Sequence, residues 1–174
     1  MTMNTVILND ADLRAAAADG ADAFVDVFFD AIMDSVGGIL SEDIIYKLNS
    51  DQMTLVVFKF LREEVMDGGF VQLIYNGLGP FVFFNPFAKA VRAWGIDDLA
   101  TLINRAGRLF RKYGKEITRE CSDEEFMAMF EKYSEFDNLD DEFVENEERW
   151  IGCIARYIDE HIDNFATIEE AEGK

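Results

Sequence analysis

Apolar residues recur with helical spacing along most of this chain, and that periodicity is the feature that most constrains its fold. Between residues 20 and 36, Phe24, Phe28 and Ile32 fall on one side of a predicted helix, as a core-facing stripe does. The chain has only two prolines among its 174 residues, so few positions interrupt a helix. The sequence therefore predicts an all-α protein, in which residues 1–174 form a single compact domain of about six to eight helices.

Capping residues place several helix boundaries. Ser, Asp and Asn favour the position before a helix, and Gly favours the position after it. One predicted helix has Ser50 as its N-cap and ends at Gly68 and Gly69, and another has Asn85 as its N-cap and ends at Gly95. A third runs from Asp97 to Gly114, and a fourth opens with a capping box of Ser122 and Glu125. The last helix has one apolar face, formed by Trp150, Ile151, Ile154, Tyr157, Ile158 and Ile162.

An aspartate stands at every fourth position of the segment 20–36, at Asp22, Asp26, Asp30 and Asp34. On a helix, each step of four residues rises about 6 Å and turns about 40° past a full rotation, so the carboxylates form one slowly winding row. Like charges four residues apart destabilise a helix by a few tenths of a kcal/mol per pair, and Asp is a mediocre helix former. Folding alone therefore does not explain the row.

The net charge is −19, and it is unevenly distributed. Residues 1–46 carry nine acids and one Arg, residues 47–119 carry seven acids and eleven bases, and residues 120–174 carry nineteen acids and four bases. A basic middle third argues against a halophile, which needs carboxylates everywhere. A charge of this size repels nucleic acid and anionic membranes and favours basic partners. We therefore expect a protein that does not itself bind nucleic acid.

Location and redox state follow from what the sequence lacks. The sequence contains no run of 18 apolar residues, which is the length needed to span a membrane. Its first residues also lack the pattern of a signal peptide. We therefore expect a cytoplasmic protein without a membrane anchor. Cys121 and Cys153 stand alone, with no CxxC motif, and are expected to stay reduced.

The sequence offers little support for catalysis or a metal. His161 is the only histidine, so a histidine-based metal cluster is excluded, and no nucleophile, base and orienting group stand together. Residues 137–148 have carboxylates at some positions of a calcium loop, but Leu139 replaces a ligand and Glu142 replaces the required Gly. We therefore predict no enzyme activity, no metal site and no cofactor.

Two further groups have more than one interpretation. The phenylalanines at 81, 83, 84 and 87 are better explained as core or dimer contacts than as a ligand site. The basic residues of the middle third could bind an anion, but ion pairs with the acidic flanks explain them better. These residues are Arg105, Arg108, Arg111, Lys112, Lys115 and Arg119.

The segment that begins EEVMDGGFVQLIYNG carries a recognisable pattern. It resembles a bacterial DNA-mimic protein family, an unknown-function domain family with an Asn-Gly-Gly-Phe-x-Gln-x-x-x-Asn signature. The match covers Gly68, Gly69, Phe70, Gln72 and Asn76, while Asp67 stands where the family has Asn. The resemblance implies an all-helical homodimer whose acidic surface imitates duplex DNA. Such a protein would occupy the DNA-binding face of a helix-turn-helix transcription factor, block its operator binding and relieve repression.

A mimic needs more than one row of acids. Duplex DNA presents one charge per roughly 1.7 Å of its axis, whereas one helical row supplies one per about 6 Å. The two acidic ends of the chain can supply further rows, and a dimer would double them. The predicted surface comprises Asp19, Asp22, Asp26, Asp30, Asp34, Asp137, Asp140, Asp141, Glu142, Glu145, Glu147, Glu148, Asp159, Glu160 and Asp163.

Three function classes stay open at this point. The first is the DNA mimic. The second is an acidic adaptor that binds a basic protein without imitating DNA. The third is an enzyme, which the sequence supports least.

Overall fold

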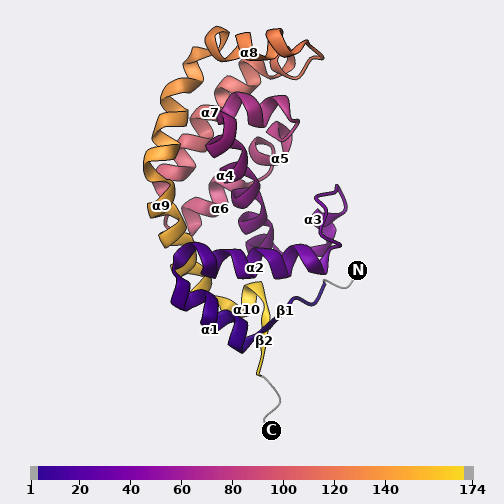
Figure 1. Ribbon diagram of the computed structural model, residues 1–174, viewed down its shortest axis with the longest axis vertical. Helices are drawn as coiled ribbons and strands as arrows, with labels where there is room; N and C mark the ends of the chain where they lie inside the picture. Colours follow the sequence, from indigo (N-terminus) through magenta and orange to yellow (C-terminus); the bar gives the residue numbers. More distant parts are fainter. Residues whose placement is uncertain (1–3, 171–174) are drawn as a thin grey trace. The chain divides into compact units, whose positions relative to one another are not determined.

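The computed structural model describes residues 4–170 and confirms the all-α prediction (Figure 1). Within these residues, seven helices have seven residues or more. No helix in this part of the chain is both long enough and apolar enough to cross a membrane. The elements in chain order are β1 (Ile7–Asn9), α1 (Asp10–Asp19), α2 (Ala21–Ser35), α3 (Ile44–Lys47), α4 (Ser50–Tyr75), α5 (Gly79–Phe83), α6 (Phe87–Ala93), α7 (Asp97–Ile117), α8 (Asp123–Lys132), the 3₁₀ helix η1 (Ser134–Phe136), α9 (Asp137–Glu160), α10 (Ile162–Phe165) and β2 (Thr167–Glu169).

The chain packs as two units, here named the terminal unit and the central unit. The terminal unit combines residues 4–56 with residues 149–170, and the central unit comprises residues 57–148. Two helices, α4 and α9, contribute to both units. The prediction of a single domain stays a prediction.

A small parallel sheet joins the two ends of the chain in the terminal unit. Strand β1 pairs with β2 in the register Ile7 to Thr167, and the Thr167 N–H donates to the carbonyl of Val6 at 2.8 Å. The sequence analysis predicted no strands. Three-residue strands are too short to show an alternating pattern, and the pairing of residues 160 positions apart depends on tertiary structure.

The core of the terminal unit forms between α2, the end of α9 and α10. Phe28, Trp150, Ile154 and Phe165 are all fully buried, and the rings of Phe28 and Phe165 meet edge to face with centroids 6.3 Å apart. Four residues of the predicted face of the last helix, Trp150, Ile151, Ile154 and Ile158, are buried, whereas Ile162 lies beyond the end of α9 and begins α10. Buried Gln52 donates from Nε2 to the carbonyl of Phe165 at 3.0 Å, which ties α4 to α10.

The N-cap of α4 is Asn49, one residue before the predicted Ser50. Asn49 Oδ1 accepts from the backbone N–H of Gln52 at 2.8 Å, and Gln52 Oε1 accepts from the N–H of Asn49 at 3.0 Å. This reciprocal pair is a capping box, which satisfies two backbone donors instead of one. The prediction of Ser50 was wrong because Ser50 offers no such return bond from a glutamate or glutamine three residues later. On α8, Ser122 is the N-cap as predicted, since its Oγ accepts from the Glu125 N–H at 3.2 Å, and its hydroxyl donates to Glu125 Oε1 at 3.3 Å.

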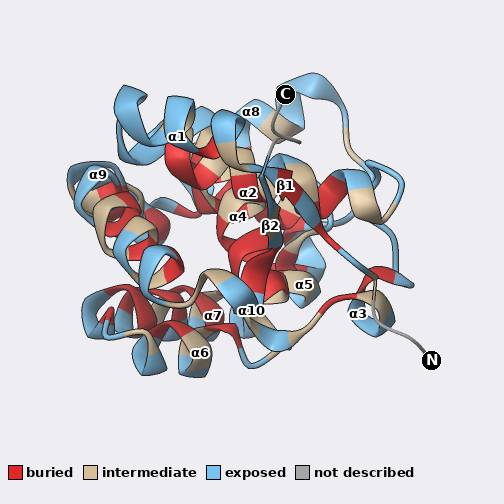
Figure 2. Ribbon diagram, turned by 90° about the horizontal axis from the view of Figure 1, so that it is seen from below, coloured by how far each residue is buried: buried red, intermediate tan, exposed pale blue. Residues whose placement is uncertain are grey.

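The core of the central unit gathers around Phe70. This ring is fully buried and lies 6.3 to 6.5 Å from the rings of Phe83, Phe136 and Phe143. Four different elements, α4, α5, η1 and α9, therefore meet at one side chain. Figure 2 shows the result on α9, where buried and exposed residues occupy opposite sides of the ribbon.

The helix break predicted at Gly68 and Gly69 is confirmed, whereas the helix end predicted at Gly114 is wrong. The backbone is not helical at Gly68 and Gly69, where Gly69 has φ +76°, and a second helical segment of α4 continues from there to Tyr75. Helix α7 continues past Gly114 to Ile117. Gly114 is buried, and a Cβ there would lie 2.8 Å from a Phe110 ring atom. Close packing therefore explains this glycine, and helix termination does not.

Candidate functional site

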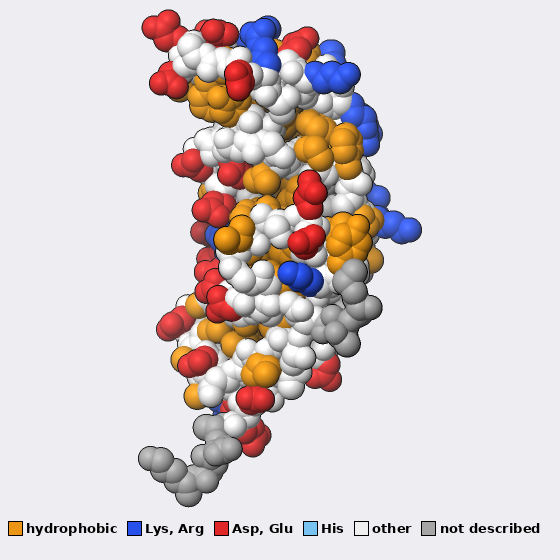
Figure 3. Space-filling model, turned by 90° about the vertical axis from the view of Figure 1, so that its right-hand side faces the viewer, with side chains coloured by type: hydrophobic (Ala, Val, Ile, Leu, Met, Phe, Trp, Pro, Cys, Tyr) orange, Lys and Arg blue, Asp and Glu red, His pale blue; other side chains and the backbone are white. Residues whose placement is uncertain are grey.

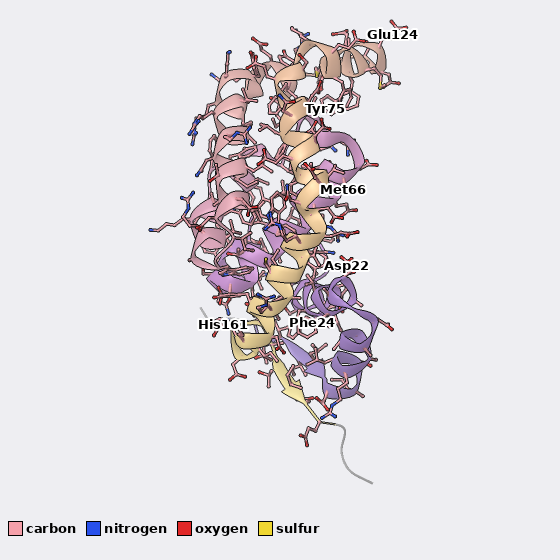
Figure 4. All side chains as sticks on the ribbon, turned by 90° about the vertical axis from the view of Figure 1, so that its left-hand side faces the viewer. Asp22, Phe24, Met66, Tyr75, Glu124 and His161 are labelled. Carbon is pink, nitrogen blue, oxygen red and sulfur yellow. The ribbon has the colours of Figure 1, made fainter. Side chains whose placement is uncertain are left out.

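Helix α2 carries the predicted aspartate row on the side away from its core contacts. Asp22, Asp30 and Asp34 are exposed and Asp26 is half-buried, while Phe24 on the same helix is buried. Figure 4 labels Asp22 and Phe24. We name Asp22, Asp26, Asp30 and Asp34 the α2 row. At about 100° per residue, these four positions spread over about 120° of the helix circumference.

A second exposed row lies on the first half of α9. Asp137, Asp141, Glu145 and Glu148 are all exposed, and we name them the α9 row. Their spacings of four, four and three residues keep them within about 80° around the helix axis. The α9 row is therefore straighter than the α2 row.

The other three predicted acids of this segment point into the central unit. Glu147 is only 7% exposed, and its Oε2 lies 2.7 Å from Nε of Arg62 on α4. Glu142 is half-buried, and its Oε2 lies 2.7 Å from Nη1 of Arg105 on α7. These two pairs link α9 to α4 and α7. The Arg62 pair is the more shielded from water and therefore the stronger of the two.

The third inward acid, Asp140, binds the kink of α4. Its Oδ1 accepts from the backbone N–H of Phe70 at 2.8 Å, which satisfies a donor that the kink leaves free. The pKa of Asp140 is raised to about 6, chiefly by burial; the Phe70 N–H opposes this shift, and the charges of Asp137 and Asp141 add to it. A Cβ at Gly69 would lie 2.4 Å from Asp140 Oδ2, so only glycine fits there.

The signature residues after the kink form a hydrogen-bond network on α4. Gln72 Nε2 donates to Asp67 Oδ2 at 2.8 Å and to Glu64 Oε2 at 3.1 Å. Asn76 Nδ2 also donates to Glu64 Oε2, at 2.9 Å. A Cβ at Gly68 would overlap the Gln72 side chain, at 2.0 Å from its Oε1. The signature therefore specifies the kink, and Asp67 supplies the acceptor oxygen that an Asn would supply in its place.

Sequence reasoning missed the parts played by Glu64 and Asp140. It placed Asp140 in the acidic surface and gave Glu64 no role, because neither residue shows its partner in the sequence. A usable signal was present for Asp140. The Gly-Gly pair predicts a helix break with free backbone donors, and such a break calls for an acceptor from elsewhere in the chain.

The remaining predicted surface residues belong to the terminal unit. Asp19 ends α1, Asp159 and Glu160 end α9, and Asp163 lies in α10, and all four are exposed. Eight of the fifteen predicted residues, including the α2 row, thus lie in the terminal unit, and seven lie in the central unit.

Basic residues lie along α7 and directly after its end in the central unit. Besides the Arg105 pair, Lys112 Nζ lies 3.9 Å from Glu135 and Arg119 lies 3.9 Å from Glu125, which bears out the expectation of pairing with the acidic flank for three residues. Arg108, Arg111 and Lys115 are exposed. Figure 3 shows Lys and Arg side chains along one edge of its upper half and Asp and Glu along the opposite edge.

The residues of the possible calcium loop are helical. Residues 137–148 form the first turns of α9, whereas a calcium loop needs an irregular backbone that wraps around the ion. His161 stacks on Tyr157 with ring centroids 4.0 Å apart, and its Nδ1 lies 2.8 Å from the Tyr157 carbonyl oxygen. A local packing role therefore accounts for the only histidine.

Comparison with known proteins agrees with this arrangement. A family model described as DMP19-like protein matches residues 46–161, which include the kink, its signature and the α9 row. The DNA mimic protein DMP19 of Neisseria meningitidis serogroup B is 33% identical over 125 residues, which cover 71% of this chain and 76% of that protein. The α2 row lies outside the residues that the family model matches. On both comparisons, the chain belongs to the family of DMP19-like proteins.

Proposed function

We propose that this protein is a DNA mimic that binds the DNA-binding face of a DNA-binding protein. The observation that carries the proposal is the sorting of acids on α9. Four of them form one exposed row, while the three that would break its line take partners inside the central unit. The similar protein of Neisseria meningitidis is itself called a DNA mimic protein.

The charge geometry supports phosphate imitation as the mode of binding. Carboxylates on one helix face stand about 6 Å apart along the axis, and each is held on a rigid helix, so a row presents charges in a fixed line. Duplex DNA carries more charge per length than one row, and a homodimer would double the row that each unit presents. Lys and Arg side chains of the target would bind these carboxylates in place of phosphates.

The proposed target is a helix-turn-helix transcription factor that is released from its operator. Dimeric repressors of this class present two recognition helices related by two-fold symmetry. A homodimer of this protein would present its acid rows with the same symmetry, and we include that dimer in the proposal. Sedimentation at micromolar concentration tests it, and a strict monomer would remove the symmetry.

The primary experiment captures the target and asks whether DNA competes for it. Immobilised protein is incubated with a lysate of its own bacterium, and bound proteins are eluted with duplex DNA at constant ionic strength. We expect DNA-binding proteins in the DNA eluate, because both ligands occupy the same face. In a gel shift, the protein should then release the captured factor from its operator. A basic partner that binds but is not displaced by DNA would favour the acidic adaptor instead.

A charge-matched pair of variants separates a shaped surface from total charge. The test variant carries Asn or Gln at the four positions of the α9 row. The control loses four exposed acids that form no single row, at Glu63, Glu120, Glu124 and Glu131. Figure 4 shows Glu124 on α8. We expect competition to fall sharply only in the test variant. Equal losses in both would show that net charge alone attracts the target.

A further inference from the structure

A cavity of about 200 Å³ lies in the central unit, on α7 and beside α5 and α6. Its apolar wall includes Val82, Phe83 and Ile103, and two basic side chains, Lys89 and Arg111, line it as well. None of its lining residues is acidic, although the chain has 35 acidic residues. The cavity is therefore a local exception to the charge of the protein.

Neither of its two basic side chains, Lys89 and Arg111, forms an ion pair with another residue in the part of the chain that the structure describes. The ion pairs of α7 involve Arg105, Lys112 and Arg119. Both side chains are exposed, whereas Val82 and Ile103 are buried. The charge thus lies at the solvent side and the apolar surface lies deeper.

The polar groups of the cavity wall indicate which kind of ligand fits the cavity. Asn85 is occupied, since its Oδ1 accepts from the Phe87 N–H at 2.7 Å and its amide donates to the Phe81 carbonyl. Asn104 on α7 is exposed and can donate from its amide to an anion. Two cations and one amide at the rim over an apolar floor are the usual elements of a site for an amphipathic anion.

We propose that this cavity binds a small organic carboxylate, whose charge is held by Lys89 and Arg111 and whose apolar part lies against Phe83 and Ile103. A volume of 200 Å³ equals the liquid volume of roughly seven water molecules, which suits a ligand of about ten heavy atoms. Arg and a carboxylate can form two parallel hydrogen bonds, which gives the site directional preference. The site is independent of the acid rows and of the proposed mimicry.

Titration with benzoate tests the proposal, with benzamide as the neutral isostere and inorganic phosphate as the anion without an apolar part. Binding is followed by NMR shifts of the backbone amides of residues 103–111 at constant ionic strength. We expect saturable benzoate binding that is at least tenfold tighter than that of benzamide or phosphate. Equal binding of benzamide would eliminate the role of the cations, and equal binding of phosphate would eliminate the apolar pocket.

Substitutions at the wall decide whether the ligand lies inside the cavity. Gly107→Ala adds a methyl group that meets Phe83 at 3.4 Å and Arg111 Nη1 at 3.9 Å, which are ordinary contacts. Because alanine also favours a helix, this variant should fold at least as stably and still weaken benzoate binding at least tenfold. Arg111→Gln should weaken it similarly, while Arg108→Gln, a neighbouring charge outside the cavity, should change it less than twofold.

Two outcomes with these variants would also overturn the proposal. Undiminished binding by folded Gly107→Ala would place benzoate on the surface. Equal losses in Arg108→Gln and Arg111→Gln would indicate diffuse attraction to the basic side of α7. Circular dichroism confirms that each variant is folded, and Arg111→Gln keeps the proposal testable if Gly107→Ala does not fold.

Discussion

The α2 row and the α9 row are both acidic faces of amphipathic helices, but they arise in different ways. On α2, the acids between Ala21 and Ser35 stand at every fourth position, so that sequence spacing alone puts them on one side. On α9, seven acids crowd into residues 137–148 and point in several directions. Partners on α4 and α7 take three of them, and the other four form the row.

The comparison shows that the acidic segment 137–148 serves two purposes, to fix α9 to its neighbours and to present exposed charge. The inward acids of α9 hold the helix in place through Arg62, Arg105 and the Phe70 N–H, and the outward acids are thereby presented on a rigid face. The α2 row lies outside the family match and spreads over a wider arc, whereas the α9 row lies within the match and is straighter. We therefore expect the α9 row to contribute more to target binding.

The largest expected effect compares the two rows directly. A variant with Asn at Asp137 and Asp141 and Gln at Glu145 and Glu148 should bind the captured DNA-binding protein about a hundredfold more weakly. That figure corresponds to about 0.7 kcal/mol for each exposed charge lost. The variant with four Asn residues in the α2 row should lose about tenfold, as measured by calorimetry at physiological ionic strength.

Salt and stability measurements provide the controls for that comparison. Wild-type affinity should fall steeply as salt rises, because exposed charges are screened over about 8 Å. Both row variants should unfold at the same temperature as the wild type or higher, since repulsion is relieved. If the α2 variant loses both binding and thermal stability, its aspartates are structural. If it binds without any loss, the α2 row is only a solvated helix face.

The next effect tests the kink that the inward acids support. Gly69→Ala should destabilise the protein by about 3 kcal/mol, because φ +76° is strained for alanine and its Cβ would lie 2.4 Å from Asp140 Oδ2. The matched control is Gly77→Ala, where φ is +84° but no atom lies within 4 Å. The control should lose only about 1 kcal/mol in urea unfolding. Equal losses would mean that Asp140 does not constrain the kink.

A smaller loss is expected when an inward acid loses its charge. Glu147→Gln should destabilise the protein by about 2 kcal/mol, because the ion pair with Arg62 is largely shielded from water. Glu148→Gln, the exposed neighbour, should change stability by less than about 0.5 kcal/mol. Thermal unfolding of both variants measures the contrast between the two faces of α9. A fully stable Glu147→Gln variant would contradict the structural assignment of this acid.

The smallest expected effect depends on pH and concerns Asp140. Its pKa in the folded protein is about 6, above the ordinary 3.8, so the native state binds the proton more tightly than the unfolded state. The contribution of Asp140 to stability is therefore greatest below about pH 4 and falls as the pH rises to about 6. After a discount for its partial exposure, the change is about 1 to 2 kcal/mol.

Asp140→Asn should remove this pH dependence. Asn can still accept from the Phe70 N–H through its side-chain oxygen, and it carries no buried charge. At pH 7 the variant should therefore be as stable as the wild type or about 1 kcal/mol more stable, whereas Asp140→Ala should lose about 1 to 3 kcal/mol with the hydrogen bond. Urea unfolding between pH 4 and pH 7 measures both, and a variant that keeps the wild-type slope would show that another group titrates.

Local rules in the sequence were sufficient for the helical class, the α2 row and the Ser122 N-cap of α8. Each depends on residues within one or two helical turns, where spacing and backbone geometry determine which side chains and backbone groups contact each other. The signature segment also pointed to the correct family, since Gly68, Gly69 and Gln72 act together within one turn of the kink. The cap of α4 was misplaced by one residue because Gln52 returns a bond to Asn49.

Tertiary structure alone decided the β1–β2 pairing, the continuation of α7 past Gly114 and the division of the α9 acids. A carboxylate in the sequence does not show whether an arginine 85 residues away lies beside it, as Arg62 lies beside Glu147. Whether a charge faces water or a buried partner depends on which helix packs against its own, and helix packing brings together residues that are distant in the chain. The sequence by itself therefore determined where this protein is acidic and that it is helical, while the fold determined which of its acids remain available to a partner.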